Sequence, residues 1–133
     1  MLVAELMQKD VKSIAPEASV AELVRTLADS HVSGLPVVEP SGRVIGVVSA
    51  TDVLQASAEK DDSVAQARFF EHTTVREIMT PNAHVIEPEA DAREAAKHML
   101  YTEVRRLFVE DHGRLVGVIS QTDIAQALGS GRL

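Results

Sequence analysis

The sequence has 133 residues, 45% of them hydrophobic and 25% charged, and a formal net charge of −7. This size suits one domain with its own core, and the acidic balance opposes nonspecific attraction to nucleic acid or membrane lipid. The absence of cysteine excludes disulfides, thiolate metal sites and cysteine nucleophiles. The chain shows neither a membrane-spanning apolar run nor, at Met1–Glu5, the basic region of a signal peptide. We therefore expect a cytoplasmic protein without membrane contact.

The chain contains an internal repeat. Val3–Ala56 aligns with Val75–Ala127, at an offset of 72 residues that becomes 71 from Gly42 and Gly113 onward. The single-residue difference falls in a turn, where length changes are tolerated. We divide the chain into a first repeat at 1–58, a linker at 59–73 and a second repeat at 74–130.

Each repeat begins with an extended piece, at 11–14 and 83–86, and continues with a helix. Ser19-Val-Ala-Glu22 and Asp91-Ala-Arg-Glu94 have the pattern of a capping box, in which N-cap and glutamate side chains satisfy backbone amides. The spacing of the apolar residues then predicts one buried face for each helix. These residues are Val20, Leu23, Val24 and Leu27, and Ala92, Ala95, Ala96 and Met99.

Two strands and a last helix complete each repeat. We predict strands at 35–38 and 44–49, and at 107–110 and 115–120, joined by turns in which Gly42 and Gly113 adopt positive φ. Each repeat is then an α/β unit of the order β-α-β-β-α, with a right-handed parallel crossover and a hairpin. One copy would expose an apolar sheet face, so we expect the two copies to pack about a pseudo-twofold axis.

The stretch between the repeats, 57–74, is polar apart from Val64, Phe69 and Phe70. We predict that it extends the preceding helix and then forms a loop. The two phenylalanines are expected to pack on the domain's own core, and an oligomer contact is the alternative.

The motif Ser49-Ala-Thr51-Asp52 and its twin Ser120-Gln-Thr122-Asp123 each follow an apolar strand and open a helix. Amides and the positive end of the dipole at such a junction favour an anion, and a nearby Asp can accept two hydrogen bonds from a ribose diol. The alternative is that these side chains only cap their helices. Duplication of the whole motif favours a site but also duplicates caps.

The repeat resembles a tandem pair of CBS domains, known as a Bateman module. The resemblance covers nearly the whole chain outside the linker, and it rests on short motifs, most of which occur in both copies. These are Glu5-Leu-Met7 and Glu77-Ile-Met79-Thr80, Pro16 and Pro88, Gly34-Leu-Pro-Val-Val38, Gly42-Arg-Val-Ile-Gly46 and Gly113-Arg-Leu-Val-Gly117, and the two Ser-x-Thr-Asp endings.

The resemblance implies an allosteric sensor of AMP, ADP, ATP or S-adenosylmethionine, with no required cofactor and with two clefts between the repeats. By position, the first cleft would use Ser49, Thr51, Asp52, Thr80, His84, Val85, Arg105 and Arg106. The second cleft would use Gln8, Lys12, Ser13, Ser33, Gly34, Ser120, Thr122 and Asp123. Members of the family usually form homodimers, and we expect a homodimer that signals to an unidentified partner protein.

The two clefts differ in the residues available to bind a phosphate. Arg105 and Arg106 can bind a phosphate bidentately in the first, whereas the second has Ser33 and Gly34 there, with His31 and Lys12 as substitutes. The alternative for the arginines is a surface pair beside Glu103 or Glu110. Gln8 stands where the family commonly has Thr, and Phe108 stands where it has Pro. We therefore predict that a phosphorylated nucleotide prefers the Asp52 cleft.

Two other functions remain open. The clefts could be vestigial in a module for protein interaction or oligomerisation, or the chain could be a small enzyme acting on a bound nucleotide. The sequence shows no nucleophile elbow, P-loop or metal-ligand spacing among its five histidines, of which we expect His98 and His112 to face solvent. We therefore expect neither catalytic activity nor a metal site.

Overall fold

The computed structural model describes residues 1–133, which form two compact units. The N-repeat unit comprises Lys12–Pro40 and Ile45–Ala83. The C-repeat unit comprises Met1–Val11, Ser41–Val44 and His84–Leu133. Both are mixed α/β units, as predicted. Each contains most of one repeat together with the opening segment of the other.

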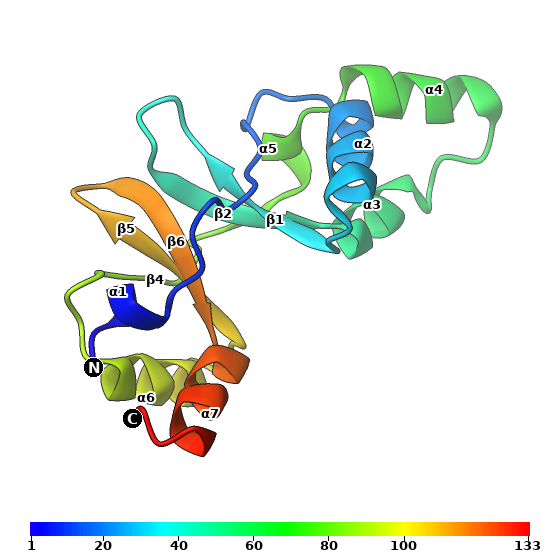
Figure 1. The fold of residues 1–133 in the computed structure, drawn as a ribbon. Helices are drawn as coiled ribbons and strands as arrows, with labels where there is room; N and C mark the ends of the chain where they lie inside the picture. The colour runs from blue at the N-terminus through cyan, green and yellow to red at the C-terminus, as the bar shows by residue number, and fades with distance from the viewer. The chain divides into compact units, whose positions relative to one another are not determined.

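The N-repeat unit contains a three-stranded sheet in the order β1-β2-β3. It also contains four helices, α2 to α5, which are labelled in Figure 1. Strand β3 is antiparallel to β2, with Thr80 opposite Val47. The predicted parallel pairing at the start of the repeat is a single bridge between Ile14 and Val37. In chain order the elements are α2 (Val20–Ser30), β1 (Gly34–Val38), β2 (Val44–Ser49), α3 (Ala50–Ser57), α4 (Ser63–His72), α5 (Val75–Ile78) and β3 (Thr80–Pro81).

The C-repeat unit has a sheet in the order β4-β5-β6. Strand β4 is parallel to β5 and β5 is antiparallel to β6, which confirms the predicted parallel pairing and hairpin. The turn glycines Gly42 and Gly113 have the predicted positive φ, at 98° and 76°. The elements are α1 (Val3–Leu6), β4 (Val85–Ile86), α6 (Ala92–Thr102), β5 (Arg106–Asp111), β6 (Arg114–Ser120) and α7 (Gln121–Gly129).

The opening segments of the two repeats are exchanged. The Ala92 amide donates to the Met1 carbonyl at 2.8 Å, and the Val3 amide donates to the Ala90 carbonyl at 2.8 Å, so α1 belongs with α6 (Figure 1). The equivalent residues of the other repeat make the same two bonds. The Val20 amide donates to the Thr73 carbonyl at 3.0 Å, and the Val75 amide donates to the Ala18 carbonyl at 2.9 Å. Each opening segment therefore completes the helix start of the other repeat.

The capping boxes predicted for the longer helices are only half formed. Ser19 Oγ accepts from the Glu22 amide at 3.1 Å, and Asp91 Oδ1 accepts from the Arg93 amide at 2.8 Å. Neither Glu22 nor Glu94 returns a hydrogen bond to the N-cap amide. Instead, the exchanged segments pair with the N-cap backbone, through bridges from Thr74 to Ser19 and from Leu2 to Asp91.

The glutamate half of such a box forms at α5, where the Thr74 amide and hydroxyl donate to Glu77 Oε2 at 2.7 and 3.1 Å. The backbone bond first, and then the hydroxyl, hold the pKa of Glu77 below its ordinary value because both stabilise the carboxylate.

Each unit has its own aliphatic core. The helix faces predicted from the sequence are buried, except that Ala96 is half-buried and Val24, at the edge of its face, is 39% exposed. The largest buried side chains include Leu23, Leu35, Val37 and Val48 in the N-repeat unit, and Met99, Leu107, Val109 and Ile119 in the C-repeat unit. Val75 and Val3 on the exchanged segments join these two cores.

The linker differs from the prediction. Rather than an extension of α3 and a loop, residues 63–72 form a separate helix, α4, because the Asp62 carboxylate accepts from the Ala65 amide at 2.7 Å and starts a new helix. Phe69 is 4% exposed and packs in the core of the N-repeat unit, with Phe70 against it, as predicted.

Gly46 and Gly117 allow the exchanged segments to approach the sheets. A Cβ on Gly46 would lie 2.6 Å from the Thr80 carbonyl oxygen, and one on Gly117 would lie 2.6 Å from Met7 Sδ. We expect Gly46→Ala and Gly117→Ala each to cost about 1–3 kcal/mol through overpacking, which lowers the melting temperature by roughly 4 °C per kcal/mol. The matched control is Gly129→Ala on α7, which meets nothing within 4 Å and should be neutral or stabilising. Circular dichroism melts measure all three, and an unchanged melting temperature for Gly46→Ala would contradict the close approach.

Candidate functional site

Ser49 and Asp52 form a reciprocal cap at the start of α3. Asp52 Oδ2 accepts from the Ser49 amide at 2.7 Å and from the Ser49 hydroxyl at 3.0 Å, and the Asp52 amide donates to Ser49 Oγ at 3.3 Å. The capping alternative is thus part of the structure. The cap uses only one carboxylate oxygen, Asp52 Oδ2. The other oxygen, Oδ1, has no hydrogen-bond partner, and the Asp52 side chain is half-buried.

Asp123 repeats this cap at the start of α7 but carries one further bond. The Ser120 amide donates to Asp123 Oδ2 at 2.8 Å, and the Asp123 amide donates to Ser120 Oγ at 3.1 Å. In addition, Gln8 Nε2 donates to Asp123 Oδ1 at 3.2 Å. Both oxygens of Asp123 are therefore occupied, in contrast to those of Asp52.

Thr80 is the counterpart of Gln8, 72 residues along the chain. It lies on β3 opposite Val47, as Gln8 lies opposite Val118 on β6. The shorter Thr80 side chain makes no bond to Asp52. The departure from the family pattern at Gln8 therefore has a structural consequence. Gln8 occupies Asp123 Oδ1, whereas Thr80 leaves the equivalent atom, Asp52 Oδ1, without a partner.

The helix starts offer fewer free amides than the sequence suggested. The Ala50 amide donates to the Ser33 carbonyl, and the Gln121 amide donates to the Arg105 carbonyl, both at 2.9 Å. The cap occupies the amide of Asp52, which leaves that of Thr51 in the first turn of α3. Thr51 is exposed, as is its counterpart Thr122.

The predicted site residues divide between the two units. The N-repeat unit contains Ser49, Thr51, Asp52 and Thr80 of the first set, and Lys12, Ser13, Ser33 and Gly34 of the second. The C-repeat unit contains His84, Val85, Arg105 and Arg106 of the first set, and Gln8, Ser120, Thr122 and Asp123 of the second.

Arg105 and Arg106 are both exposed and make no ion pair. They are therefore a surface pair, as in the alternative, but neither forms the ion pair with Glu103 or Glu110, and Glu110 instead accepts from the Val44 amide at 2.7 Å. Phe108 is buried within the C-repeat unit.

The C-repeat unit holds a polar pocket of about 230 Å³ beside Asp123, also lined by Glu5, Gln126, Ser130 and Arg132, which the sequence reasoning did not single out. His98 is half buried rather than facing solvent, because its ring packs edge to face on His84 at 5.7 Å. His112 is exposed, as predicted. The structure contains no group of three or more His, Cys, Asp or Glu side chains arranged to hold a metal. No helix has the length and apolar character needed to cross a membrane.

The CBS domain family matches this chain twice, at residues 3–59 and 75–130. The protein therefore belongs to the CBS-domain family, with two CBS domains in tandem. This confirms the resemblance seen in the repeated motifs.

Two curated relatives illustrate the match. The uncharacterized protein MJ1225 of Methanocaldococcus jannaschii is 30% identical over 96% of this chain and 43% of its own length. The chloroplastic CBS domain-containing protein CBSX1 of Arabidopsis thaliana is 28% identical over 94% of this chain and 63% of its own. The chain thus spans less than two thirds of either relative.

One solved structure aligns with this chain over almost the full length of both proteins. CBSX2 of Arabidopsis thaliana, determined in complex with AMP, is 26% identical and superposes with a TM-score of 0.78, over 99% of this chain and 98% of that one.

Proposed function

We propose that this protein is a regulatory module that binds an adenine nucleotide, with Asp52 as the ribose-binding residue. The observation that carries the proposal is the half-capped carboxylate of Asp52, whose Oδ1 atom has no partner. A carboxylate in this state can accept hydrogen bonds from the two hydroxyls of a ribose. The AMP complex of the similar CBSX2 supports an adenine nucleotide as the ligand.

The rest of the first cleft follows by position. Thr51 and Thr80 offer hydroxyl groups, and His84 and Val85 would contribute to the base pocket. Arg105 and Arg106 would bind the phosphate, since an unpaired guanidinium matches phosphate oxygens bidentately. The Asp123 cleft would bind more weakly, because a ligand must first displace Gln8 from Asp123 Oδ1.

Thermal shift with AMP, ADP, ATP, S-adenosylmethionine and NAD tests the proposal. A ligand that binds only the native protein stabilises it by about 2.7 kcal/mol at a hundredfold excess over its dissociation constant. We expect AMP to give a saturable rise of several degrees. If no compound of the panel raises the melting temperature, the interaction module with vestigial clefts becomes the better proposal, and turnover of a bound compound would favour the enzyme.

We also propose that the module assembles as a homodimer that passes the signal to a partner protein. Large apolar side chains remain exposed on several helices, among them Leu54 on α3 at 69%, Tyr101 on α6 at 90% and Leu128 on α7 at 52%. Exposed apolar side chains of this size favour association. A monomeric mass in solution at micromolar concentration would refute the dimer.

A further inference from the structure

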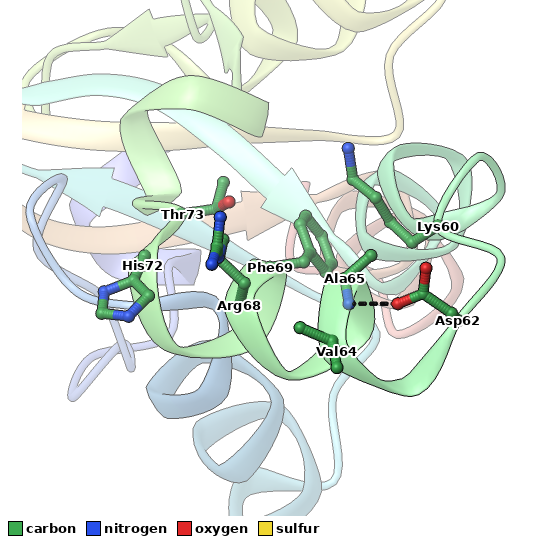
Figure 2. A pocket seen from close by; sticks show the side chains of 8 residues that line it. All are labelled: Lys60, Asp62, Val64, Ala65, Arg68, Phe69, His72 and Thr73. Atoms are coloured by element: carbon green, nitrogen blue, oxygen red, sulfur yellow. Dashed lines mark hydrogen bonds between the residues drawn. The ribbon is translucent and has the colours of Figure 1, made fainter.

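A second concave site lies beside the linker helix α4, within the N-repeat unit and with no residue of the predicted nucleotide sites in its wall. The pocket has a volume of about 620 Å³, in the range typical of small-molecule sites. Its lining residues are Lys60, Asp62, Val64, Ala65, Arg68, Phe69, His72 and Thr73 (Figure 2).

Local hydrogen bonds hold the wall of this pocket in place. Gln66 Nε2 donates to the Lys60 carbonyl at 2.7 Å, which ties the loop after α3 to α4. The Lys60 amide donates to the Ser57 carbonyl at 3.0 Å, and Asp62 caps α4 through the Ala65 amide. The pocket is therefore formed by fixed backbone rather than by a free loop.

The apolar part of the lining comes from α4. Phe69 is anchored in the core and packs edge to face on Phe70 at 5.3 Å, so its ring is a rigid part of the wall. Val64 lines the same pocket but is 68% exposed, although it is a large apolar side chain. A ligand with an apolar portion would cover Val64, and removing the Val64 side chain from water favours binding.

The charged part of the lining is basic, although the protein is acidic. Lys60 and Arg68 have no carboxylate within 4.0 Å, and His72 meets only the exposed Glu71, at 3.9 Å. The single carboxylate in the lining, Asp62, is occupied by the cap of α4. Figure 2 shows Arg68 between Lys60 and His72 and next to Phe69. The pocket thus combines unpaired cations with an apolar wall.

We propose that this pocket binds a small amphipathic anion, a molecule with a carboxylate or phosphate head and a short hydrophobic tail. Arg68 pairs with the head group, since a guanidinium matches both anions bidentately, and Val64 and Phe69 contact the tail. The volume of the pocket favours a small molecule over a peptide or a membrane surface.

The proposal is tested by amide chemical-shift mapping of the ¹⁵N-labelled protein with octanoate and with octyl phosphate. We expect saturable shifts confined to residues around 60–73, with a dissociation constant of about 1 mM or lower. The stronger of the two ligands identifies the preferred head group. Acetate and octylammonium, which lack the tail or carry the wrong charge, should bind at least tenfold more weakly, and saturating AMP should not displace octanoate.

Two variants and one control complete the test. Arg68→Gln and Val64→Asp both alter exposed side chains and should weaken octanoate binding at least tenfold while keeping a dispersed native spectrum. Arg93→Gln, an exposed arginine on α6, should bind like the unaltered protein. The proposal fails if neither ligand saturates by 10 mM or if the shifts map elsewhere. It also fails if octylammonium binds as tightly as octanoate or if Arg68→Gln leaves the affinity unchanged.

Discussion

Val3→Asp is expected to unfold the C-repeat unit rather than the repeat in whose sequence it lies. Val3 is 0% exposed and belongs to the core of Met99, Leu107 and Ile119. A carboxylate placed there has no cationic partner, and an uncompensated buried charge costs about 3–5 kcal/mol. That is a large fraction of the stability of a domain of this size.

Hydrogen exchange detected by mass spectrometry measures where protection is lost. For Val3→Asp we expect the larger loss in peptides of 84–133, and for Val75→Asp, its counterpart 72 residues along the chain, in peptides of 12–83. Leu2→Asp is the control, because Leu2 is 44% exposed and its neighbour Val3 keeps the core contact. Loss of protection at 12–56 in Val3→Asp would show that the opening segments are not exchanged.

The second large effect concerns AMP affinity. We expect Asp52→Ala to weaken AMP binding about 10- to 100-fold, because a hydrogen bond to a charged group contributes roughly 1.5–3 kcal/mol. Asp123→Ala is the matched control. Both variants remove the carboxylate half of a capping box and leave the serine N-cap in place, so we expect similar costs in stability, but only Asp52 has an open acceptor oxygen. Isothermal titration calorimetry measures both, and equal losses of affinity in the two variants would contradict the unequal clefts.

Exchanging the residues that distinguish the two aspartates sharpens this test. Gln8→Thr removes the donor to Asp123 Oδ1 and should strengthen AMP binding at the second cleft, visible as a rise in stoichiometry. Thr80→Gln places an amide beside Asp52 and should weaken the first cleft several-fold. Both positions are exposed, so neither change removes core packing. If neither variant alters the binding isotherm, Gln8 has no part in the difference.

The predicted loop at 57–74 is wrong because the local signals in this stretch are weak. Asp62 followed by Ser63 and Val64 is a helix start, yet the polar composition of 57–74 favoured a loop. The cap on the Ala65 amide and the burial of Phe69 stabilise α4 instead. The amphipathic pattern also placed Val24 on the buried face of α2, but the edge of a helix face is buried only if a neighbouring element covers it.

The sequence by itself determined what local patterns and duplication can specify. The repeat, the apolar strands and the turn glycines predicted two α/β units, and the duplicated Ser-x-Thr-Asp motif predicted the candidate site and its family. Only the tertiary structure decided which repeat receives each opening segment. From the sequence, Val3 and Val75 could each be buried in the core of their own repeat or of the other repeat, because the two similar repeats offer similar apolar partners. The family resemblance places Gln8 and Asp123 in the same cleft, but only the tertiary structure shows that Gln8 Nε2 donates to Asp123 Oδ1, a contact across 115 residues that no local spacing encodes. Long-range hydrogen bonds and core packing make these choices, and the bond from Gln8 adds a difference between the two aspartates to the difference in arginines that the sequence already shows.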